Sequence, residues 1–182
     1  MSADNQVNND LQYVRGVLES SRAFPSTTPT VLYLWAAIVF IGFLAMDYGH
    51  GWFWPIGGLG GGLISMWLNR RAAESRGQID RSHILRTNLH WGIGLAGGIL
   101  LSLPLQISGL IDEPTNGQIA ILIISICYFL AGVHLDRFML WIAGLAVVAY
   151  ALTFFLNEWV WTIPGAVMAI GLALAGVRQR SV

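Results

Sequence analysis

Long apolar stretches separated by short polar connections make up the chain after residue 29. A helix needs about 20 apolar residues to cross the hydrocarbon core of a bilayer. The pattern therefore predicts an all-α, polytopic membrane protein with six transmembrane helices. The predicted spans are residues 30–47, 52–68, 89–110, 117–133, 138–156 and 160–177.

The N-terminal part has a different pattern, so residues 1–28 are expected to be cytoplasmic and residues 29–182 to form the transmembrane domain. Leu11, Val14 and Leu18 recur at helical spacing among polar residues, which predicts an amphipathic helix near the N-terminus. Its apolar face is narrow and its net charge is near zero. We therefore expect these three side chains to dock on protein, as partner contacts, rather than on lipid.

The distribution of charge predicts how the spans are oriented. All ten basic residues are arginines, and all of them fall in segments that alternate spans would place on one side. The connections on the other side carry only acidic charges, at Asp47, Asp112, Glu113 and Glu158. Arginine is enriched on the cytoplasmic side of membrane proteins. The sequence therefore predicts a multi-pass protein of the cell (inner) membrane with both termini in the cytoplasm.

Composition excludes several functional classes. Charged residues make up only 11% of the chain and the net charge is zero, which argues against nucleic acid as a partner. No ionisable side chain lies deep inside a predicted span, although ion-coupled transporters need such groups near the midplane. No nucleophile motif, phosphate-binding glycine loop or zinc signature is present. We therefore expect a non-enzymatic protein, and no motif identifies a cofactor.

The predicted spans form three hairpins that share several features. Each hairpin has a tryptophan near its cytoplasmic start, at Trp35, Trp91 and Trp141. The second and sixth spans also open alike, with two tryptophans followed by a proline and, later, by arginines. We infer one helical hairpin used three times in parallel orientation, as in proteins with repeats related by an axis along the membrane normal. The matching segments are Trp52-Phe53-Trp54-Pro55 and Trp159-Val160-Trp161 with Pro164.

Glycines at four-residue spacing predict close helix packing in the second and third spans. Small residues at this spacing let helix backbones approach each other in a membrane. The two interpretations are packing within the monomer and a groove that receives a lipid or a helix of another subunit. The candidate packing or partner residues are Gly57, Gly58, Gly61, Gly62, Gly94 and Gly98.

The connection over residues 69–88 is rich in arginine and would lie at the cytoplasmic surface. Anionic headgroups attract basic residues there by about 1 kcal/mol each. The simpler interpretation is that these arginines serve only as a topology signal. The candidate headgroup contacts are Arg70, Arg71, Arg76, Arg81 and Arg86.

Three histidines lie at the predicted cytoplasmic side, and His83, His90 and His134 are the candidate metal or haem ligands. No compact zinc-ligand spacing accompanies them. The favoured interpretation is interfacial histidine bonded to the backbone or to lipid phosphate.

The first third of the chain resembles a group of uncharacterised bacterial integral membrane proteins. The resemblance rests on Asp10-Leu11-Gln12-Tyr13-Val14-Arg15 and on the entry into the first span, Leu32-Tyr33-Leu34-Trp35. It implies a multi-span bundle after a short helix, and it implies no activity and no site residues.

Together these features predict a membrane scaffold or regulatory subunit that packs with a partner protein, with lipid, or with further copies of itself. Two alternatives stay open. One is a passive channel or carrier for a small solute, lined by the glycines and serines of the second and third spans. The other is a His-ligated, cofactor-binding electron-transfer protein.

Overall fold

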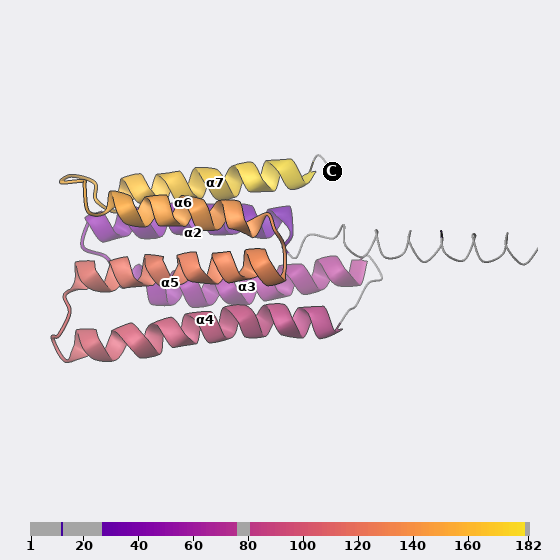
Figure 1. Cartoon of the computed structure of the whole chain (residues 1–182), viewed down its shortest axis with the longest axis horizontal. Coiled ribbons are helices and arrows are strands. Elements are labelled where there is room, and N and C mark those ends of the chain that lie inside the picture. The colour runs from indigo at the N-terminus through magenta and orange to yellow at the C-terminus, as the bar shows by residue number, and fades with distance from the viewer. Residues whose placement is uncertain (1–11, 13–26, 76–80, 181–182) are drawn as a thin grey trace, which may run out of the picture.

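The computed structural model describes residue 12 and residues 27–75 and 81–180, without the side chains of residues 81–83 and 180. Long helices joined by short connections make up nearly all of residues 27–75 and 81–180 (Figure 1), which confirms the all-α class. Leu11, Val14 and Leu18 of the predicted amphipathic helix lie outside the described residues. The helices are α2 (Pro29–Asp47), α3 (Phe53–Ser75), α4 (Arg81–Ile107), α5 (Glu113–His134), α6 (Met139–Leu152) and α7 (Thr162–Arg180).

Four of these helices, α2, α4, α5 and α7, are long and apolar enough to cross a membrane. The helix α3 has 23 residues, but its glycines add little apolar surface and its last turns are polar. The helix α6 has only 14 residues, which span about 21 Å at 1.5 Å per residue. The apolar stretch predicted over residues 138–156 continues beyond α6 as a turn, in which the N–H groups of Thr153 and Phe154 bond to carbonyls three residues earlier.

Several helix ends differ from the predicted spans. The helix α3 continues to Ser75, past the predicted end at residue 68, and an Arg70–Glu74 pair at 2.9 Å supports this extension on its exposed side. The helix α5 begins at Glu113, before the predicted residue 117. The Asp112 carboxylate accepts the backbone N–H of Thr115 at 2.9 Å and caps this helix, so the Pro-Thr-Asn-Gly run becomes its first turn rather than a separate turn.

This cap makes a pH-dependent contribution to the stability of the folded chain, and Asp112→Ala should remove that contribution. Hydrogen bonds from Thr115 hold the pKa of the exposed Asp112 carboxyl below its usual value. The ionised form therefore stabilises the folded chain above the ordinary aspartate pKa of about 3.9, and this contribution is lost as the pH falls through the lower folded value. We expect Asp112→Ala to lower Tm at pH 7 and to differ less from the parent near pH 3. If Asp112→Ala lowered Tm equally at both pH values, the carboxylate charge would not be responsible for the loss of stability.

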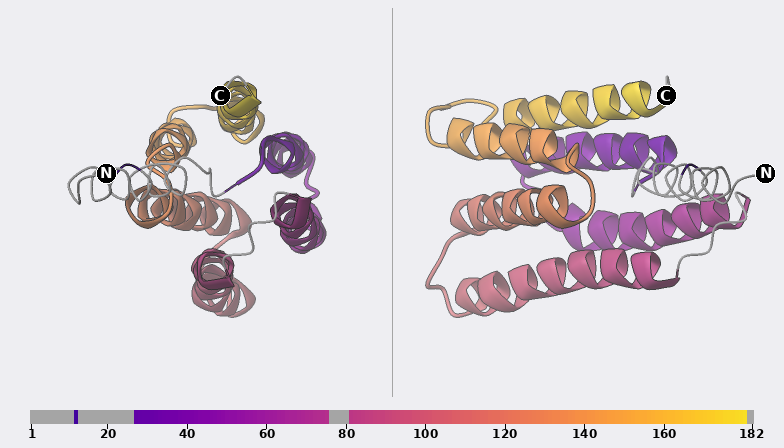
Figure 2. Two further views of the ribbon diagram at one scale, coloured as in Figure 1. Left: turned by 90° about the vertical axis from the view of Figure 1, so that its right-hand side faces the viewer. Right: turned by 45° about the vertical axis from the view of Figure 1, so that its right-hand side comes forward.

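The six helices stand side by side in an incomplete ring. Viewed end-on (Figure 2), the order around the ring is α3, α2, α7, α6, α5, α4. The contacts agree with this order, because each helix packs on its neighbours in it, and the most extensive contacts join α2 to α7 and α5 to α6. One end of the ring carries the described arginines and is called here the arginine end. The opposite end carries Asp47, Asp112, Glu113 and Glu158 and is called the acidic end.

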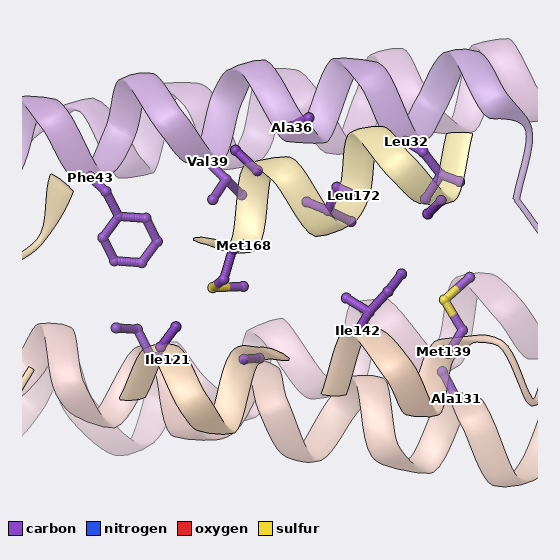
Figure 3. Packing of buried hydrophobic residues seen from close by; sticks show 14 of the residues in the cluster. Leu32, Ala36, Val39, Phe43, Ile121, Ala131, Met139, Ile142, Met168 and Leu172 are labelled. Carbon is purple, nitrogen blue, oxygen red and sulfur yellow. The ribbon is translucent and has the colours of Figure 1, made fainter. Parts of the chain in front are cut away.

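The apolar core lies within one part of this ring. Its buried side chains come from α2, α5, α6 and α7 and from Trp161 just before α7, and Figure 3 shows side chains of α2 and α7 above those of α5 and α6. Leu172 and Ala146 at its centre are fully buried. By contrast, Gly61 is the only buried residue of α3, and only 6% of the apolar window of α4 is buried. The helices α3 and α4 thus flank the core and end the ring on either side of its opening.

Candidate functional site: the open junction between α3 and α4

Each hairpin packs on itself, so α2 contacts α3, α4 contacts α5, and α6 contacts α7. Neighbouring hairpins meet through one kind of junction, in which the second helix of a hairpin packs on the first helix of the next. This junction forms between α5 and α6 and again between α7 and α2. The third position for it is between α3 and α4, where the described residues show no contact of similar extent. The structure therefore has three hairpins, and one of the three junctions between them is open.

The junction between α7 and α2 shows how the contact is built. A methyl group placed on Gly165 of α7 would collide with the Phe43 side chain of α2, whose Cγ would lie at 2.8 Å. Near the arginine end, Gly176 of α7 receives the ring of Tyr33 in the same way, at 2.9 Å. Ala169, between the two glycines, is buried. Small residues on α7 thus accept large side chains of α2.

The junction between α5 and α6 follows the same plan. The segment Leu130–His134 of α5 matches residues 174–178 of α7 in sequence, and Gly132 is the counterpart of Gly176. A methyl group on Gly132 would meet the Leu140 side chain of α6 at 2.6 Å. The second helix of a hairpin therefore offers a glycine to the start of the next hairpin in both junctions.

On α3, the corresponding face is uncovered. When Trp54 of α3 is aligned with Trp161, Gly58 is the counterpart of Gly165 and Gly62 is the counterpart of Ala169. A methyl group on either Gly58 or Gly62 would meet no atom within 4 Å. The counterparts of Gly165, which α2 covers, and of the buried Ala169 are thus open on α3. Gly58 and Gly62 were both predicted packing residues, and the described chain supplies no partner for them.

The facing surface of α4 is also exposed. When Trp91 of α4 is aligned with Trp35 of α2, Ile99 is the counterpart of Phe43 and Leu95 is the counterpart of Val39. Phe43 and Val39 are 4% and 7% exposed, whereas Ile99 and Leu95 are 53% and 40% exposed. At these positions both sides of the third junction therefore carry small or apolar residues, as in the α7–α2 interface, without being packed.

Hydrogen bonds hold α3 and α4 to their own hairpins. The indole Nε1–H of Trp35 in α2 donates to Ser65 Oγ in α3 at 2.9 Å, and Ser65 Oγ donates to the Gly61 carbonyl at 2.7 Å. In the second hairpin, His90 Nε2 of α4 lies 2.9 Å from the Cys127 carbonyl oxygen of α5, and Trp91 stacks edge-on against Tyr128. These contacts hold each hairpin together. Few contacts join α3 to α4 among the described residues, so the boundary between the two hairpins is weakly held.

The other predicted packing glycines have partners within the chain. Gly61 faces Ile38 and Trp35 of α2, and Gly57 faces the side chain of Phe53 in its own helix. On α4, Gly94 faces Cys127 and Gly98 faces Ile123, both on α5. Gly61, Gly94 and Gly98 thus lie against side chains of the neighbouring helix in their own hairpin, whereas Gly57 lies against a side chain of its own helix.

No metal site forms among the candidate ligands whose side chains the structure describes. His90 is engaged with the Cys127 carbonyl, His134 is exposed at the end of α5, and the side chain of His83 is outside the described residues. The residues that the structure describes contain no group of three His, Cys, Asp or Glu side chains able to hold a metal ion.

The candidate headgroup arginines whose side chains are described lie at the arginine end. Arg70 pairs with Glu74, Arg71 lies 5.3 Å from the ring centre of Trp67, and Arg86 is exposed. The side chains of Arg76 and Arg81 lie outside the described part of the chain.

Sequence reasoning identified the glycines of the junction but missed its other half. Leu95 and Ile99 look like ordinary lipid-facing residues, and only the alignment of Trp91 with Trp35 marks them as counterparts of buried positions. Comparison of the chain with protein-family models, curated proteins and solved structures finds no match.

Proposed function

We propose that this chain is a non-enzymatic subunit or scaffold of the cell membrane, which binds a transmembrane helix of a partner protein on the Gly58–Gly62 face of α3. One observation carries the proposal. On α7, Gly165 is covered by Phe43 of α2 and Ala169 is buried, whereas the equivalent Gly58 and Gly62 of α3 have open space above them. In a membrane, helices associate mainly through close van der Waals packing and small residues. A face of this kind therefore favours a helix as its ligand.

The proposal includes six membrane crossings with the arginine end in the cytoplasm. The four long apolar helices support it, as does the separation of charge, since the connections at the acidic end carry no arginine. The glycine-rich α3 and the short α6 would cross as members of their hairpins, because α2 and α7, to which they are packed, span the full thickness. Leu11, Val14 and Leu18 would add contacts to the partner on the cytoplasmic side.

Two glycine substitutions on α3 test the proposed docking face. Gly62→Leu would fill the space above the face and should abolish co-purification of the partner from gently solubilised native membranes. Gly60→Leu is the matched control, because Gly60 also has no atom within 4 Å of an added methyl group. Two residues along a helix correspond to a rotation of about 200°, so this leucine points away from the face and the partner should be retained.

Quantitative mass spectrometry of the purified complexes gives the readout, and tryptophan fluorescence confirms that both variants are folded. Retention of every stoichiometric partner by folded Gly62→Leu would contradict the proposal, as would equal loss with Gly60→Leu.

A further inference from the structure

We propose that the third junction closes within the chain, with α4 packing on the Gly58–Gly62 face of α3 in the register that α2 adopts on α7. The inference takes the docking face of the proposed function as its starting point and adds how that face is regulated. When α4 covers the face, no partner helix can reach it. When α4 stands away, as in this structure, the face is available.

Continuity with the two junctions that are already formed points to α4 as the occupant of the face. Going around the ring, α5 meets α6 and α7 meets α2, and the next pair in the same relation is α3 and α4. Both members of this pair belong to the same chain and end the ring on the two sides of its opening (Figure 2). The apolar residues of α4 also match those by which α2 packs on α7. If a second copy of the chain or a lipid covered the face, α4 would not need to match α2 in this way.

The register follows from the contacts between α7 and α2. These antiparallel helices pair Gly165 with Phe43 near the acidic end and Gly176 with Tyr33 near the arginine end. The alignment of Trp54 with Trp161 replaces Gly165 by Gly58, and the alignment of Trp91 with Trp35 replaces Phe43 by Ile99. The first contact therefore becomes Gly58 with Ile99. Stepping one turn along both antiparallel helices then gives Gly62 with Leu95. The side chains that would seat on the two glycines are thus the half-exposed Ile99 and Leu95.

The closing movement needs no change inside either hairpin. Trp35–Ser65 and His90–Cys127 hold each hairpin together, so the two hairpins can approach as units. Closure would replace lipid contacts of Ile99 and Leu95 with contacts to the α3 backbone, which the glycines make accessible. Packed interfaces tend to be either formed or separated rather than continuously deformable, so two discrete states are expected.

Cysteine pairs test the closed register. Cys127 is the only native cysteine, and Cys127→Ala provides a background in which only introduced thiols react. A disulfide requires Cβ atoms about 4 Å apart. In the purified full chain reconstituted in phospholipid vesicles without partner, a mild oxidant should convert most molecules of Gly58→Cys/Ile99→Cys to an intrachain disulfide. The pair Gly62→Cys/Leu95→Cys should behave alike, which guards against misfolding of one variant.

The control pair is Gly60→Cys/Ile99→Cys, in which the α3 thiol points away from α4 and should stay free. Loss of free thiols is measured by mass after maleimide labelling, and a denaturing gel separates intrachain from interchain products. A disulfide joining two chains would overturn the proposal in favour of a second copy as the occupant. Free thiols in both test pairs, or equal crosslinking of the control, would also overturn it.

A second arm separates this inference from the proposed function. Intrachain locking of Gly58→Cys/Ile99→Cys should abolish partner binding, and reduction should restore it. If the lock forms and the partner still binds, closure occurs but the partner site is elsewhere, so the regulatory role is overturned. If the lock does not form but Gly62→Leu loses the partner, closure is wrong and the docking face stands.

Discussion

Gly165→Leu is expected to lower the free energy of unfolding by about 3 kcal/mol or more, the upper range for overpacking a close interface. The reason is the contact between α7 and α2, which forms the most extensive interface of the ring. A side chain at Gly165 would have to displace Phe43, whose Cδ2 would lie 3.0 Å from the new Cβ. Phe43 is itself held by Trp54 at 5.2 Å and by Trp161 at 6.2 Å between ring centres. The aromatic ring therefore has no free space into which it can move.

SDS titration of the purified protein, followed by tryptophan fluorescence, measures this loss. Gly144→Leu provides the matched control, because Gly144 is also helical but an added methyl group there would meet nothing within 4 Å. Removing an open glycine from a helix should change stability by less than about 1 kcal/mol, in the stabilising direction. If Gly165→Leu were as stable as Gly144→Leu, the α7–α2 contact described above would be wrong.

Asp47→Ala should lower the free energy of unfolding by about 2 to 3 kcal/mol, since hydrogen bonds to a charged group are stronger than neutral ones. Asp47 ends α2, and its carboxylate accepts the backbone N–H groups of Trp161 at 3.2 Å and Thr162 at 2.7 Å. These two bonds join the start of α7 to a residue more than a hundred positions earlier in the chain. Removing them leaves backbone donors unsatisfied at the acidic end, where the first and third hairpins meet.

Asp47→Asn keeps one acceptor oxygen, so its free energy of unfolding should fall less than that of the alanine variant. Glu158→Gln is the control for the general effect of removing an acidic charge from this end, because Glu158 is exposed and makes no hydrogen bond or ion pair within the described residues. The same SDS titration ranks the three variants. A deficit in Glu158→Gln as large as that in Asp47→Ala would show that charge, rather than the two bonds to α7, accounts for the effect.

The long apolar stretches predicted the all-α class, because a run of apolar residues long enough for a bilayer has few other stable conformations. It placed the helix ends less well, since capping by Asp112 and pairing of Arg70 with Glu74 extend α5 and α3 beyond their apolar cores. The positions of three histidines suggested a ligand set, but His90 is bonded to the Cys127 carbonyl, and the residues that the structure describes contain no group of three metal-ligating side chains. Composition indicates which chemistry is available, and only packing decides which groups meet.

The glycines illustrate the same division between sequence and structure. Gly58, Gly61, Gly62 and Gly94 share one residue type and similar spacing, so the sequence by itself determined only that close helix contacts were expected. Tertiary structure decided that Gly61 and Gly94 are covered by side chains from their own hairpins while Gly58 and Gly62 face open space. The physical reason is that local sequence sets the helices and their small-residue faces, whereas the order of hairpins around the ring determines which faces are covered. That order depends on contacts between distant segments, such as Asp47 with Thr162, and it leaves one junction open.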